Sequence, residues 1–210
     1  DHDVSGAYGG PIKRDRLWFY SVARDQGIHK LPVGIAFWPN LHEGKYGWNY
    51  QPDRSKPRVE YKNMWKNVNA RVTWQATQKN KFNIFWDEQD RITYALGGGG
   101  STSTPESSAI GISDPSRAFN ATWSSPLTNR LVLEAGYGGT HLQWGGNEKP
   151  GYGRRMNRVT EQSGIIPGLT YRGMTWDRNI LSPDHVRASV SYVTGTHNAK
   201  FGVLRSFNVF

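Results

Sequence analysis

Histidine and carboxylate side chains are the groups in this 210-residue sequence that could bind a metal ion or transfer protons. The six histidines are His2, His29, His42, His141, His185 and His197. None of them has a second histidine or a carboxylate at the spacing that would place metal ligands on one strand face. Asp87 and Glu88 are the only adjacent carboxylates, but neighbours in a strand point to opposite faces. The pattern predicts no metal, no cofactor and no catalytic residue, so we do not expect an enzyme.

The remaining catalytic motifs are also missing. The sequence has no cysteine, which excludes disulfides, thiolate zinc sites, iron–sulfur clusters and cysteine nucleophiles. It has no Gly-x-Ser-x-Gly elbow for a serine nucleophile. The glycine-rich run at 97–104 is followed by neither a Lys-Ser/Thr pair nor a helix, so we expect a flexible loop rather than a phosphate-binding loop. A glycosidase would need two facing carboxylates, and the sequence leaves that alternative open.

The charge balance is strongly basic, with 26 Lys and Arg residues against 17 Asp and Glu residues and a formal net charge of +9. Proteins that bind nucleic acid gather such charges in a patch or stripe. Here the basic residues are scattered over the whole chain, so we expect no nucleic-acid partner.

Alternation of apolar and polar residues is the strongest structural signal. Residues 68–76, 119–124 and 185–192 alternate without a break, and the runs at 81–87 and 130–137 do so except at Phe85 and Val132. Because side chains alternate between the two faces of a strand, each run has one apolar and one polar face. No segment shows a sustained helical period. The sequence therefore predicts an all-β fold.

Mean hydropathy is −0.68, and 13% of the residues are aromatic. The aromatic content argues against disorder, because disordered chains are poor in aromatic residues. No apolar run approaches the roughly 20 residues of a membrane-spanning helix. A transmembrane β-barrel remains compatible, because its strands alternate lipid-facing and lumen-facing residues and keep the average hydropathy low.

The spacing of the alternating runs predicts four hairpins, about eight strands in all. Short polar turns are expected at 13–16, 77–80, 125–128 and 194–197. Long connections rich in glycine, proline and aromatic residues are expected at about 28–64, 94–116 and 144–184. All tight turns would then lie at one end of an antiparallel meander and all long loops at the other, which is typical of outer-membrane barrels.

Four short segments resemble parts of the TonB-dependent outer-membrane receptors. The most specific is Gly9–Tyr20, a Gly-Gly-Pro-Ile turn followed by charged residues and Leu-Trp-Phe-Tyr. The others are Val72–Phe85, Trp123–Tyr137 and Gly195–Gly202, which are similar to barrel hairpins of that family. The nearest group is the receptors with a carboxypeptidase-regulatory-like N-terminal domain.

The resemblance implies that residues 1–210 are part of a β-barrel domain, without the plug and without a signal peptide. Such receptors have a 22-stranded barrel, so we expect an early-to-middle portion of the wall. The expected function is energised uptake of a scarce ligand (a siderophore, oligosaccharide or peptide) across the bacterial outer membrane. The expected partners are outer-membrane lipid, lipopolysaccharide attracted by the basic charge, and the TonB complex through a plug outside this chain.

Ligand contacts would then come from the long loops, and exposed aromatic and arginine side chains make good recognition groups. The candidates are Trp38, Tyr46, Trp48, Trp144, Tyr152, Arg154, Arg155 and Trp176. Trp74 and Trp123 stand two to three residues before expected turns, where an aromatic girdle at the membrane surface is predicted. Charged side chains of the strands would point to the lumen, and these are Arg71, Lys81, Asp87, Arg130, Glu134 and Arg187.

Two other interpretations stay open. Eight strands can close on themselves, which would give a complete small outer-membrane barrel. A soluble all-β carbohydrate-binding module or glycosidase would also suit aromatic, glycine-rich loops.

Overall fold

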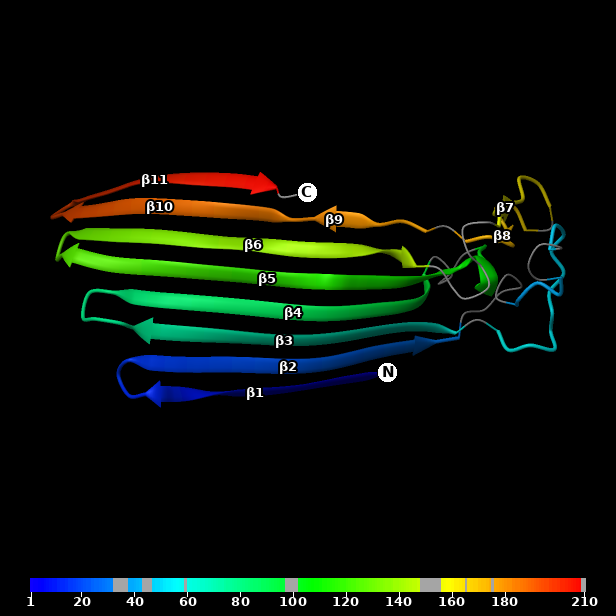
Figure 1. Cartoon of the computed structure of the whole chain (residues 1–210), viewed down its shortest axis with the longest axis horizontal. Coiled ribbons are helices and arrows are strands. Elements are labelled where there is room, and N and C mark those ends of the chain that lie inside the picture. The colour runs from blue at the N-terminus through cyan, green and yellow to red at the C-terminus, as the bar shows by residue number, and fades with distance from the viewer. Residues whose placement is uncertain are drawn as a thin grey trace.

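A single antiparallel sheet dominates the structure, a computed structural model that describes residues 1–31, 38–42, 47–58, 60–96, 102–147, 156–164, 166–174 and 176–208 (Figure 1). Eight strands follow one another in chain order across the sheet, which confirms the predicted all-β meander. They are β1 (His2–Lys13), β2 (Leu17–Lys30), β3 (Tyr61–Gln75), β4 (Lys81–Leu96), β5 (Ala109–Thr128), β6 (Leu131–Asn147), β10 (Pro183–Thr194) and β11 (His197–Asn208).

Short elements occupy the longer connections. They are η3 (Pro105–Ser107), β7 (Val159–Thr160), β8 (Thr170–Tyr171) and β9 (Asn179–Leu181). β9 extends the main sheet by pairing with β6, whereas β7 and β8 pair with each other. Among the described residues no helix has the length and apolar character needed to cross a membrane.

The four tight turns gather at one end of the sheet, at the left of Figure 1, and the longer connections gather at the other. This is the sorting that the hairpin spacing predicts. The last turn, at 195–196, has Gly195 at φ +45°, a conformation that glycine adopts without steric cost.

The third turn was predicted wrongly. β5 runs on through Thr128, so the turn is at 129–130 rather than 125–128. Proline is typical of turns, but Pro126 lies in the strand and pairs with Val132. The strand register shifts just after it, and its missing N–H is tolerated at such an irregularity. The Thr128 hydroxyl then accepts the backbone N–H groups of Arg130 and Leu131. Consequently Trp123 lies further from its turn than the sequence suggests.

Several strands also extend into the regions expected to be loops. β5 begins at Ala109, although the connection was expected to last to about residue 116, and β6 continues to Asn147. A register shift between Ser113 and Ser116 interrupts the alternation of β5. That irregularity hides the outer part of the strand from a period-two analysis.

One face of the sheet carries the apolar side chains. Trp74, Phe82 and Trp123 stand in one register row near the tight turns, and the rings of Trp74 and Phe82 stack at 5.4 Å. Trp86 and Phe119 stand in another row nearer the loops, with ring centroids 5.8 Å apart. Other side chains of this face stay largely exposed, among them Val68, Ile84, Val186, Phe201 and Val203.

Polar side chains on the opposite face bond one another across the strands. Asp87, buried in β4, accepts hydrogen bonds from Asn67 at 2.6 Å and Gln89 at 2.7 Å. The Asn69 amide donates to Asn67 at 3.2 Å. The Thr73 hydroxyl donates to the Asn83 side-chain oxygen at 3.1 Å. Over β3 and β4 this face is therefore a hydrogen-bonded polar surface, as the alternation predicts, whereas β2 places Trp18, Tyr20 and Val22 on it.

β1 and β11 are the two edges of the sheet order in the described chain. The Gly-Gly-Pro-Ile segment lies in β1. A Cβ atom at position 9 would come within 2.8 Å of the Tyr20 ring, so glycine there makes room for that ring. Pro11 is acceptable because an edge strand needs fewer backbone donors.

Candidate ligand-binding site

The loops at the end opposite the tight turns pack together into a unit that we name the loop cap (Figure 1). It is formed by the described residues of three connections: 38–42 and 47–58, 102–108, and 156–164 with 166–174. The connections are far apart in sequence, but backbone and side-chain bonds join them. The loop cap is where the predicted ligand contacts fall.

The second and third connections are joined by backbone hydrogen bonds. The Thr104 N–H donates to the Thr170 carbonyl at 2.9 Å, and the Thr170 N–H donates to Thr102 at 2.6 Å. The Ser107 hydroxyl adds a bond of 2.8 Å to the same Thr170 carbonyl. Thr104 and Ser108 are completely buried. Since buried polar groups stabilise a structure only when they are hydrogen-bonded, these contacts fix the two connections relative to each other.

Asn40 organises the first connection. Its side-chain oxygen accepts the N–H groups of Gln51 at 3.0 Å and His42 at 3.3 Å, and its amide donates to Asn49 at 3.0 Å. Its own backbone N–H donates to the Glu106 carboxylate at 3.3 Å, which links this connection to η3. One buried asparagine therefore folds its own loop and docks it on the next.

A small apolar core lies under these bonds. Leu169 and Tyr171 are buried, and Tyr50, Val159 and Ile166 pack against them. The Tyr171 hydroxyl donates to the Trp48 carbonyl at 2.9 Å, across to the first connection. Burial, together with the nearby negative charge of Glu106, raises the pKa of Tyr50 to about 12. Burial also raises the pKa of Tyr171, so both tyrosines stay neutral at ordinary pH and act as packing and hydrogen-bonding groups.

Two of the eight predicted contact residues, Trp38 and Trp48, lie in the loop cap. Trp48 is 54% exposed, and the Arg172 guanidinium lies 3.7 Å from its ring centroid. Trp38 is half-buried, with Arg58 at 5.9 Å from its ring. Because cations stack favourably on indole rings, both contacts fix the aromatic groups in place.

The other six candidates do not share one location. Trp144 belongs to β6, where it pairs with Ser113 and Asn179, so it is a strand residue rather than the loop residue expected. Trp176 is exposed between β8 and β9. The remaining four lie outside the described residues, and these are Tyr46, Tyr152, Arg154 and Arg155.

Arg172 was missed by the sequence analysis. It is buried, its Nη1 donates to the Asn157 carbonyl at 2.9 Å, and its backbone has φ 72°. A positive φ is uncommon for a residue other than glycine, and it marks a position held by its surroundings. No local pattern around residue 172 could reveal a contact with a tryptophan so distant in sequence.

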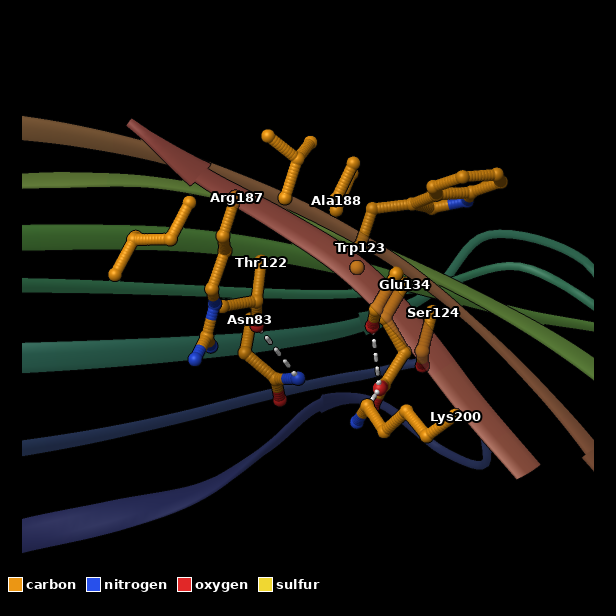
Figure 2. A pocket seen from close by; sticks show the side chains of 13 residues that line it. Asn83, Thr122, Trp123, Ser124, Glu134, Arg187, Ala188 and Lys200 are labelled. Carbon is orange, nitrogen blue, oxygen red and sulfur yellow. Dashed lines mark hydrogen bonds and ion pairs between the residues drawn. The ribbon is translucent and has the colours of Figure 1, made fainter. Parts of the chain in front are cut away.

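A concave region lies on the polar face near β11 (Figure 2). It is a cavity of about 450 Å³. Its polar side chains come from five strands, and they include Asn83, Thr122, Ser124, Glu134, Arg187, Ser189 and Lys200. Lys200 Nζ and the Ser189 hydroxyl both donate to the Glu134 carboxylate, the latter at 3.2 Å.

The charged residues predicted to line the lumen mostly share this polar face. Strand register places Arg71, Lys81 and Asp87 on it, as it does Glu134 and Arg187 of the cavity. The sixth residue of that group, Arg130, lies instead in the turn between β5 and β6, because the turn comes later than predicted.

No three His, Asp or Glu side chains within the described ranges gather as they would around a metal ion. Comparison of the chain with protein-family models, curated proteins and solved structures found no match.

Proposed function

We propose that this chain forms part of the barrel wall and the outer loops of a TonB-dependent outer-membrane receptor. Its role is transport of a scarce ligand rather than catalysis. The observation that carries the proposal is the exposed apolar face of the sheet. Soluble monomers rarely expose contiguous apolar patches larger than a few hundred Å². Lipid would cover this face, as it covers the outward band of a transmembrane barrel.

Strand length supports the same function. The eight long strands have 12 to 20 residues, whereas a tilted strand needs about 9–11 to cross a bilayer. On β10 the apolar side chains run from Tyr192 to Val186, about 20 Å along the strand and about 16 Å after a tilt of about 40°, and the Asp184 carboxylate follows them. The apolar side chains of this strand therefore cover about two thirds of the roughly 25 Å apolar band of outer-membrane barrels.

Aromatic and polar groups border the apolar face at both ends. Near the turns, the Trp123 indole N–H donates to the Asn80 side chain at 2.9 Å. Near the loops, the Tyr137 hydroxyl and His141 bond the buried Asp184 carboxylate at 2.9 Å and 3.1 Å. Amphipathic aromatic residues prefer the two membrane surfaces, where the ring meets lipid and the polar atom meets water.

In this proposal the loop cap faces the outside of the cell, and its exposed aromatic groups, Trp48 first, meet the ligand. Outer-membrane lipid and lipopolysaccharide surround the wall. The TonB complex acts through a plug that the other parts of the protein supply. A soluble binding module or glycosidase would have no lipid to cover the exposed apolar face of a sheet of this length.

Cell fractionation tests the proposed location. The protein that contains this chain is expected in the outer-membrane fraction and is expected to remain there after washing with alkaline carbonate, because its strands are embedded in lipid. A known soluble periplasmic protein, followed in the same samples, serves as the control. Recovery in the soluble fractions would contradict the proposal and favour the soluble binding module.

A further inference from the structure

We propose that the cavity on the polar face binds an oxyanion of the transported ligand, a carboxylate or a phosphate, with Arg187 as its anchoring cation. The inference rests on the proposed function, in which the polar face lines the lumen. It adds a chemical class to the otherwise unspecified ligand.

Glycine in the neighbouring strand fixes the position of Arg187. Arg187 on β10 pairs with Gly136 on β6. A Cβ atom at position 136 would lie 2.8 Å from Arg187 Nε and 3.3 Å from its Cγ. The arginine side chain therefore lies across the glycine backbone instead of extending freely. Any residue larger than glycine at position 136 would displace this side chain.

The charges of the cavity leave Arg187 available. Glu134 is the carboxylate that lines the cavity, and it is occupied by Lys200 and the Ser189 hydroxyl. Within the described part of the chain, Arg187 makes no hydrogen bond or ion pair, although its charge also acts on the Glu134 carboxylate. Glu134 and Lys200 neutralise each other, so the cavity retains the positive charge of Arg187. Because Arg187 is exposed to solvent, its attraction for an anion is screened by salt.

Neutral donors stand beside the guanidinium. In Figure 2 the Arg187 side chain runs alongside Thr122 and Asn83, while the Glu134–Lys200 pair lies on the other side of the cavity. The Asn83 amide donates to the Thr122 hydroxyl at 3.5 Å, a long bond that an anion could replace. A planar guanidinium with adjacent amide and hydroxyl donors matches a carboxylate or phosphate. The volume of about 450 Å³ suits a small ligand group.

Titration calorimetry on the complete protein in detergent tests the inference, with citrate and inorganic phosphate as probes and glycerol as the uncharged control. We expect saturable binding of at least one anion, weakened by added salt. Arg187→Gln is expected to weaken it at least tenfold. Arg187→Lys is expected to weaken it less, because lysine keeps the charge but loses the planar fork. The tighter probe identifies the oxyanion as carboxylate or phosphate.

Arg205→Gln is the matched control. Arg205 on β11 pairs with Val186, one residue before Arg187, and therefore lies on the opposite face. The same charge change there should leave anion binding unchanged. The inference is overturned if neither anion binds, if Arg187→Gln binds as well as the wild type, or if Arg205→Gln loses as much. If anion binding fails but the protein is found in the outer membrane, the inference is wrong and the proposed function stands. If the protein fractionates as a soluble protein, the proposed function itself is contradicted.

Discussion

Replacing Ile84 by arginine is expected to destabilise the protein in a bilayer by about 2–4 kcal/mol, the cost of a cation near the middle of the lipid-facing surface of a barrel. Ile84 lies in β4 on the apolar face, between Val72 and Ala121 in register, and is 52% exposed. In a soluble module, a half-exposed position of this kind would tolerate arginine with a change within about 0.5 kcal/mol. The two interpretations therefore predict clearly different results.

The neighbouring residue gives the control for that experiment. Asn83 lies next to Ile84 and points to the polar face, so Asn83→Arg should cost no more than about 1 kcal/mol, from lost amide bonds. Urea unfolding of the complete protein in lipid vesicles, followed by tryptophan fluorescence, measures both variants. An equal loss of unfolding free energy in the two variants would contradict the claim that one face of the sheet meets lipid and the other meets water.

Loss of the folded state is the expected result when the 210-residue chain is refolded alone in detergent. β1 and β11 end the sheet order, and their unpaired backbone groups would face the apolar phase. Each such group costs several kcal/mol in lipid. β11 also exposes Phe201 at 71% and Val203 at 66%, which favours edge-to-edge association. The chain should therefore aggregate unless further strands complete the barrel.

Size-exclusion chromatography with light scattering measures this outcome. The complete protein, refolded in the same detergent, is the control and is expected to be monodisperse. A monodisperse, urea-resistant species formed by residues 1–210 alone would contradict the partial barrel. It would instead support the closed eight-stranded barrel, in which β1 pairs with β11.

Period-two alternation was sufficient to predict the sheet, its two faces and the sorting of turns and loops. It failed where a strand is irregular: at Pro126, which was interpreted as a turn residue, and near Ser113, where β5 changes register. These failures have one physical cause. Bulges and edge positions tolerate residues that normally break strands, so local composition misplaces the boundary.

The candidate sites were predictable only in part. Tryptophans in the long connections could be named because aromatic groups in loops are conspicuous in a sequence. The partners that hold them could not, because Arg172 reaches Trp48 from another loop. Likewise the contact between Arg187 and Gly136 depends on the register of β6 and β10, which are joined by a long connection. Long-range register is not encoded in local periodicity.

Cysteine labelling at two adjacent positions of β10 tests the central claim, that one face of the sheet meets lipid and the other meets water. The chain has no native cysteine, so each introduced thiol is the only one that this chain contributes. Ser189 shares the polar face with Glu134, whereas Val190 pairs with Leu133 and Phe201 on the apolar face. In vesicles containing the complete protein, a charged maleimide should label Ser189→Cys rapidly and leave Val190→Cys unlabelled. Equal labelling of the two, or faster labelling of Val190→Cys, would contradict the account.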